Sequence, residues 1–115
     1  MDDIRKAYSV CIGTSLEVLG LIGFVSRPVA GVIGTNVLLS FIHLVVGALG
    51  WFGLAGLGKT YSGAMGTVLF ILGVLGFIPA CAGSLHSILG INAGTSALHA
   101  LVGGVSLAMA FGMKE

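Results

Sequence analysis

The 115-residue chain contains very little charge. Aspartate, glutamate, lysine and arginine make up 8% of it, whereas hydrophobic residues make up 57%. A soluble domain carries about 25% charged residues, so this chain has too few to cover a surface in water. The net charge of +1 also leaves no basic face for nucleic acid. The composition therefore excludes a soluble domain and a nucleic-acid-binding protein.

Cysteine and proline are equally scarce, with two residues of each. Two cysteines cannot form a cysteine-rich metal motif. We expect Cys11 and Cys81 near opposite membrane faces, too far apart for a disulfide, whose Cα atoms must lie within about 7 Å. The chain also lacks a phosphate-binding loop and a nucleophile–base pair. We therefore expect no enzymatic activity.

Long apolar runs make up most of the chain. They cover residues 7–25, 36–57, 61–78 and 92–113, and Pro28 and Pro79 follow the first and third runs. About 20 apolar residues cross a bilayer as a helix, and proline ends a helix. We predict an all-α bundle of four transmembrane helices, with residues 1–115 as one integral membrane domain. Residues 79–91 are expected to form a loop.

The chain contains an internal repeat. Ten of the twenty positions from 6 to 25 are identical to those 53 positions later, and the segment around His43 recurs 56 positions later around His99. Each unit, residues 6–57 and 59–113, reads as helix, loop, helix. Two spans per unit give both copies the same orientation, which predicts a pseudo-twofold axis along the membrane normal. His43 and His99 should face each other near that axis.

The basic residues predict the orientation of the bundle. Arg5, Lys6, Lys59 and Lys114 fall on one side of the membrane and Arg27 on the other. Because cytoplasmic segments are enriched in lysine and arginine, we expect both termini in the cytoplasm.

Three ionisable side chains should lie at one depth. His43 follows Asn36, and His99 follows Asn92, by seven residues, or about 10 Å along a helix. Glu17 reaches a similar depth from the end of the first run. An unpaired ionisable group in a membrane is costly, so we predict a contact between Glu17 and a histidine, direct or bridged. The intramembrane polar cluster comprises Glu17, His43, His99, Ser40, Ser96, Asn36 and Asn92.

Helical spacing places the histidines on stripes of small and polar residues. Asn36, Ser40 and His43 share one helix face, and Asn92 and His99 share the matching face. Small residues let membrane helices approach closely. The residues expected to serve this packing are Gly13, Gly20, Gly47, Gly50, Gly66, Gly73 and Gly103.

Several short motifs resemble a prokaryotic family of small four-span membrane proteins, known only as a domain of unknown function. The residues that carry the resemblance are Gly23-Phe24, Ile33-Gly34-Thr35-Asn36, the segment 43–50, Gly76-Phe77 and Leu98-His99. The resemblance covers nearly the whole chain. It implies a four-helix membrane fold and no particular activity.

Three functions fit these features. The first is a structural role, as an accessory or assembly subunit of a membrane complex or as a homo-oligomer. The second is a subunit that binds a haem- or chlorophyll-type pigment, with His43 and His99 as tetrapyrrole or metal ligands. The third is a small ion or proton conductor that uses Glu17. We expect the first, without a cofactor, in a prokaryotic plasma membrane with lipid and other membrane subunits or further copies as partners.

Overall fold

The computed structural model describes residues 2–27, 29 and 31–112. All the regular secondary-structure elements in this part of the chain are helices. The elements are α1 (Asp2–Val25), α2 (Val37–Leu49), the 3-10 helix η1 (Gly50–Ala55), α3 (Gly58–Leu75), α4 (Pro79–Leu89) and α5 (Ala93–Phe111). Four segments are long and apolar enough to cross a membrane: α1, α2 continued by η1, α3 and α5. The predicted all-helical chain with four candidate spans is therefore confirmed. Pro28 and residues 113–115, on which some expected boundaries fall, lie outside the described residues.

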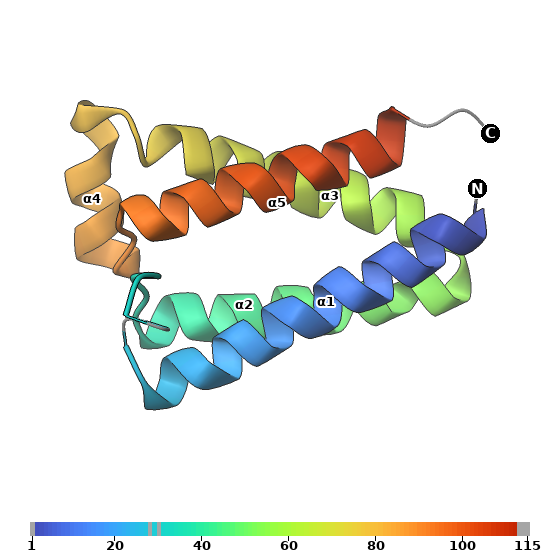
Figure 1. Cartoon of the computed structure of the whole chain (residues 1–115), viewed down its shortest axis with the longest axis horizontal. Coiled ribbons are helices and arrows are strands. Elements are labelled where there is room, and N and C mark those ends of the chain that lie inside the picture. The colour runs from blue at the N-terminus through green and yellow to red at the C-terminus, as the bar shows by residue number, and fades with distance from the viewer. Residues whose placement is uncertain (1, 28, 30, 113–115) are drawn as a thin grey trace.

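Two helical hairpins lie side by side in the bundle (Figure 1). α1 packs against α2 and η1, while α3 packs against α5. Both termini lie at one end, which we call the terminal end, and α4 crosses the opposite end, the α4 end (Figure 1). The bundle extends 40 Å along its longest axis, which exceeds the hydrocarbon thickness of about 30 Å.

Glycines hold the two helices of each hairpin close together. A methyl group on Gly13 would lie 2.5 Å from the carbonyl oxygen of Gly47, and one on Gly66 would lie 3.0 Å from that of Gly103. Gly20, Gly50 and Gly73 are equally confined by backbone atoms of the neighbouring helix, and all seven glycines assigned to packing are buried. Because lipid offers helices no hydrophobic drive to associate, this close approach is what holds each hairpin together.

The segment expected as a loop at residues 79–91 is mostly helical, and that expectation was wrong. Pro79 occupies the first turn of α4, where its missing N–H costs nothing. Gly90 ends the helix at φ 71°, a conformation that favours glycine. The corresponding connection between α1 and α2 contains Gly31 at φ 74° and a β-bridge between Val29 and Ile33. Its β-branched residues and glycines disfavour a helix there.

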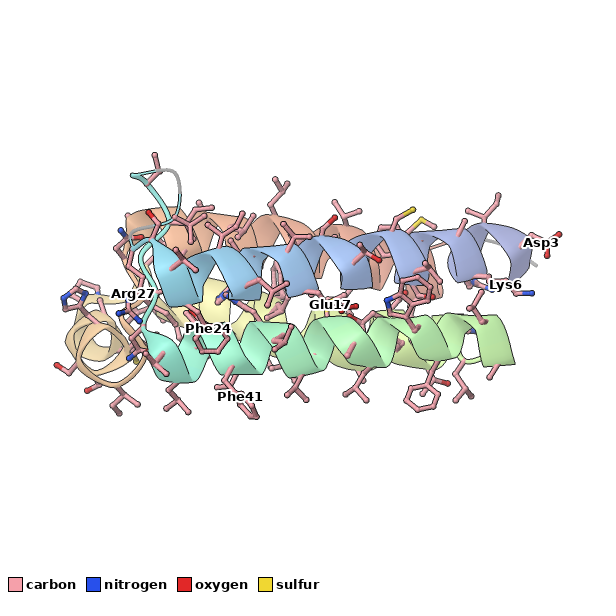
Figure 2. The ribbon with its side chains drawn as sticks, turned by 90° about the horizontal axis from the view of Figure 1, so that it is seen from below. Asp3, Lys6, Glu17, Phe24, Arg27 and Phe41 are labelled. Atoms are coloured by element: carbon pink, nitrogen blue, oxygen red, sulfur yellow. The ribbon has the colours of Figure 1, made fainter. Side chains whose placement is uncertain are left out.

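A small apolar core joins the two hairpins. Leu16 from α1 packs with Tyr61, Met65 and Leu69 from α3, and all four are buried. Apolar side chains elsewhere on the helices are largely exposed, as in Phe24 and Phe41 (Figure 2). Such a surface is suited to lipid rather than to water.

Candidate functional site

The two intramembrane histidines meet between the hairpins. His43 lies in the middle of α2 and His99 in the first half of α5. Their Nε2 atoms are 2.9 Å apart, and the rings stand nearly perpendicular, at 79°. The side chains are 2% and 0% exposed. The predicted facing of the two histidines is therefore present as a direct, buried hydrogen bond.

This bond constrains the protons on both rings. One Nε2 must carry a hydrogen and the other must present a lone pair. The accepting ring, when neutral, therefore carries its proton on Nδ1. Neither Nδ1 atom has a hydrogen-bond partner within the described residues. The pair thus contains a buried N–H group whose acceptor is not supplied by this part of the chain, which is costly in a protein interior.

Two asparagines link the hairpins at the α4 end. Asn36 and Asn92 cap α2 and α5. Their side-chain oxygens accept from the backbone N–H groups three residues further along the chain, those of Leu39 and Thr95, at 2.8 Å and 3.0 Å. Their amide groups donate across the interface: Asn36 to the carbonyl of Ile88, at 2.8 Å, and Asn92 to that of Val32, at 3.1 Å. Positions 32 and 88 are separated by the same 56 residues as the two asparagines. The two links are therefore reciprocal.

The hydroxyl groups near the asparagines and histidines make different contacts in the two hairpins. The Thr95 hydroxyl donates to the carbonyl of Gly34, which joins α5 to the first hairpin. The hydroxyl groups of Ser40 and Thr35 are 3.2 Å apart. Ser96 is fully buried, and its hydroxyl has no partner among the described residues. Ser40 and Ser96 thus lie in the interior, and among the described residues neither bonds to a histidine.

Glu17 bonds a tryptophan and not the histidine pair in the described part of the chain. The side chain lies between α1 and α2 (Figure 2), and its Oε1 accepts a hydrogen bond of 2.7 Å from Trp51 Nε1. Leu16, one residue earlier, occupies the core between the hairpins. Neighbouring residues on a helix are about 100° apart, so Glu17 is turned away from the position that Leu16 holds. Glu17 therefore accepts from Trp51, and within the described residues no direct hydrogen bond joins it to either histidine.

At the terminal end, α1 is tied to α5. Arg5 stands among the charged residues that precede the first apolar run, yet its side chain is only 2% exposed. Its Nε and Nη2 donate to the carbonyls of Met109 and Ala110, at 2.9 Å and 3.3 Å. These carbonyls belong to the last turn of α5, where the helix itself provides no donors. A cation is favourable at that position because it also complements the helix dipole. The sequence around Arg5 does not indicate that its acceptors lie in the last turn of α5.

Two tyrosines make further links between the hairpins. The Tyr8 hydroxyl lies 2.7 Å from that of Ser106, and the Tyr61 hydroxyl donates to the carbonyl of Val46 at 2.8 Å. Both tyrosines stand on the first helix of one hairpin and reach the second helix of the other. Their recurrence 53 positions apart was the available sequence signal for these contacts.

The histidine geometry does not fit a tetrapyrrole held between the two rings. Two nitrogens on opposite faces of one metal lie about 4 Å apart, because each bond is about 2 Å long. The Nε2 atoms are 2.9 Å apart, which leaves no gap for a macrocycle. Gly47 and Gly103 face α1 and α3 respectively, rather than each other. Among the described residues, no three histidine, cysteine, aspartate or glutamate side chains are grouped to hold a metal ion.

Comparison of the chain with protein-family models, with curated proteins and with solved structures finds no match. Function is therefore inferred from the contacts described above. They define a helical, membrane-type bundle whose interior polar groups mostly connect one hairpin to the other.

Proposed function

We propose that this chain is a structural protein of the prokaryotic plasma membrane, acting as an accessory or assembly subunit or as a homo-oligomer. The observation that carries the proposal is the use of polar side chains that bond from one hairpin to the other. His43 bonds His99, and Asn36 and Asn92 each bond the backbone of the opposite hairpin. Polar side chains that bond across helices stabilise packing in a membrane. A catalytic activity or a cofactor forms no part of this proposal.

The proposal includes a tandem repeat of two hairpins in the same orientation, in keeping with the resemblance to small four-span proteins. It is supported by contacts that recur at corresponding positions. Gly13 approaches Gly47 and Gly66 approaches Gly103, and the asparagine links are reciprocal. A half-turn about the membrane normal would relate the two hairpins. An experimental structure in which the relating axis lies in the membrane plane would contradict this arrangement.

Cytoplasmic termini are the orientation that we propose. Lys6 lies at the terminal end and Arg27 at the α4 end (Figure 2), and lysine and arginine favour the cytoplasmic side. The test is labelling of single cysteines in intact cells after Cys11→Ala. Cys81, on α4 and half-buried, should react with an impermeant maleimide. Thr60→Cys in a Cys81→Ala background, exposed near the terminal end, should react only after permeabilisation. The opposite pattern would reverse the orientation.

The structural role is tested by purification from native membranes in a mild detergent. Native mass spectrometry should find the chain with a second membrane protein or with further copies of itself. The purified protein should show no Soret absorption. A Soret band that is lost on His43→Leu would favour a pigment-binding subunit. Ion or proton flux into liposomes that is lost on Glu17→Gln would favour a conductor, and either result would contradict the proposal.

A further inference from the structure

Two hollows in the bundle have different walls. The first is a cavity of about 220 Å³ between α2 and α3. Apart from His43, His99 and Tyr61, its wall consists of apolar side chains, and two of them, on Leu49 and Val68, are exposed. This cavity therefore opens between the two helices toward lipid. The second hollow, which we call the α4-end pocket, has a volume of about 390 Å³ and a wall that contains polar and charged side chains.

The α4-end pocket is built on closely packed connections between the helices. A methyl group on Gly34 would lie 2.6 Å from the carbonyl oxygen of Gly90, and the backbone N–H of Gly34 donates to Asn92 Oδ1 at 3.0 Å. These contacts join the connection before α2 to the connection before α5. The volume of the pocket lies within the usual range for ligand sites, which is about 300–1,000 Å³. The pocket is lined by Arg27, Gly34, Thr35, His86, Gly90 and Asn92.

Most polar side chains in this wall already bond other groups of the chain. The Asn92 amide and the Thr35 hydroxyl bond a backbone carbonyl and a serine hydroxyl, respectively. His86 Nδ1 donates to the carbonyl of Ile91 at 3.2 Å, which holds the ring in place. The Arg27 side chain is exposed, and its guanidinium group carries five N–H donors. It is therefore the group best suited to bind a ligand here.

The α4 end carries a positive charge and no negative charge that would balance it. The acidic residues of the chain are Asp2, Asp3, Glu17 and Glu115, so none occurs between positions 18 and 114. The connection between α1 and α2, the helix α4 and its flanking segments all come from that stretch. Arg27 therefore meets no carboxylate at this end of the bundle. An anion that binds there comes from outside the chain.

The pocket lies at the level of the lipid headgroups. The bundle extends 40 Å along its longest axis, and a bilayer with its headgroups is about 40–45 Å thick. Arg27 lies beyond the apolar Phe24 toward the α4 end (Figure 2). Phospholipid phosphates occupy this level, and a guanidinium group matches the geometry of phosphate oxygens. A lipid with a net negative charge fits better than a zwitterionic lipid, whose cation would find no carboxylate in the pocket.

We propose that the α4-end pocket binds the phosphate of an anionic phospholipid, which Arg27 holds. The proposal does not depend on which side of the membrane the α4 end faces. The probe is phosphatidylglycerol, and its control is phosphatidylcholine with the same acyl chains, which has a phosphate but no net charge. The full chain, labelled with ¹⁵N at histidine, is studied in phosphatidylcholine nanodiscs. His86 lines the pocket, whereas His43 and His99 lie in the interior.

Replacing part of the phosphatidylcholine by phosphatidylglycerol should shift the His86 resonances saturably and leave those of His43 and His99 in place. In native mass spectrometry, the chain should retain phosphatidylglycerol over phosphatidylcholine by about fivefold, the effect of one basic residue at an anionic membrane surface. Equal retention of the two lipids would overturn the proposal. So would a His86 shift that rises linearly with the phosphatidylglycerol content, because it would report surface charge and not a site.

Matched variants test the role of Arg27. Arg27→Gln should abolish the shift of the His86 resonances, and Arg27→Lys, which keeps the charge, should retain part of it. Lys6→Gln removes the same charge from the terminal end (Figure 2) and should leave the shift unchanged. Unchanged His43 and His99 resonances establish that the variants are folded. A shift that persists in Arg27→Gln, or that Lys6→Gln reduces equally, would overturn the assignment.

A soluble competitor separates a lipid from a free ligand. Glycerophosphoglycerol has the headgroup of phosphatidylglycerol without the acyl chains. At the molar amount at which phosphatidylglycerol saturates the pocket, it should leave the His86 resonances in place in phosphatidylcholine nanodiscs. A shift comparable to that caused by the lipid would assign the pocket to a soluble phosphodiester and overturn the proposal of a membrane lipid.

Discussion

The interface between the hairpins has two sides, and they are built differently. Where α1 meets α5, Arg5 bonds the last turn of α5 and Tyr8 bonds the Ser106 hydroxyl. Where α2 faces α3, Gly50 stands at the position corresponding to Ser106, and Tyr61 lies against it and bonds the Val46 carbonyl. That second side also contains the cavity. The two hairpins therefore meet along one closed side, where α1 bonds α5, and one open side, where the cavity lies between α2 and α3.

Between these sides, the contacts of the two hairpins are alike. The histidines bond to each other, and the asparagines make reciprocal links to Ile88 and Val32. One difference between the two sides is Arg5, which stands 53 positions before Gly58 and bonds the last turn of α5. The histidine and asparagine bonds fix the hairpins relative to each other. The bonds of Arg5 and Tyr8 close the side between α1 and α5, and the side between α2 and α3 stays open to lipid.

The largest expected effect concerns packing within a hairpin, on which both sides depend. A side-chain atom on Gly103 would collide with the backbone of Phe70, whereas one on Gly104 would lie 3.8 Å from the nearest atoms of the Phe70 ring. Gly103→Leu should destabilise the bundle by about 3 kcal/mol or more, as overpacking against backbone does. Gly104→Leu is the matched control and should cost much less. Unfolding in mixed micelles measures both, and equal losses would show that α3 and α5 do not pack as described.

The closed side is broken most directly at Arg5. Arg5→Met should destabilise the bundle by about 1.5–3 kcal/mol, because hydrogen bonds to a charged group are lost from the end of α5. Lys6→Met, at the adjacent exposed position, should have little effect. The same unfolding assay provides the comparison. If Lys6→Met cost as much as Arg5→Met, the two substitutions would be acting through net charge and not through the α1–α5 contact.

The centre of the interface is tested at the histidines. His43→Leu should cost about 1–3 kcal/mol, since it leaves the His99 ring without its partner. His43→Leu/His99→Leu should cost less than the sum of the single substitutions, by roughly 0.6 kcal/mol, the average for hydrogen bonds between membrane helices. A double-mutant cycle gives this coupling energy. Strict additivity would mean that the pair contributes nothing as a pair.

Glu17 should show the smallest effect. Glu17→Gln keeps an oxygen that can accept from Trp51 Nε1, so the expected change is below about 0.5 kcal/mol. Trp51 fluorescence should change with the substitution, because the indole bonds this side chain. An effect larger than that of His43→Leu would indicate that the carboxyl group has a role at the centre of the interface.

Apolar periodicity and residue spacing were sufficient to predict the four candidate spans and the facing of His43 and His99. Those features depend on residue spacing, which a sequence displays directly. The partner of Glu17 was not predictable in this way. Depth could be counted along the helix, but the direction of the side chain depends on how α1 packs, and Leu16 takes the core position.

Two other features could not be predicted from apolar periodicity. Arg5 reaches carbonyls more than one hundred residues away in the chain, and nothing local indicates that choice. The helical turns of α4 follow from Pro79 at its start and Gly90 at its end. The sequence of α4 is weakly polar and contains a glycine, which is typical of a loop. α4 also has no buried residues, so its sequence shows no apolar periodicity.

The central claim is that one hydrogen bond between His43 and His99 joins the two hairpins. Solid-state NMR of the ¹⁵N-histidine-labelled chain in lipid bilayers tests it by detecting the coupling between the two Nε2 nuclei. The account predicts one protonated and one unprotonated Nε2, coupled to each other, with His86 showing no such coupling. Two uncoupled Nε2 nuclei, or the same tautomer with Nε2 protonated on both rings, would contradict it.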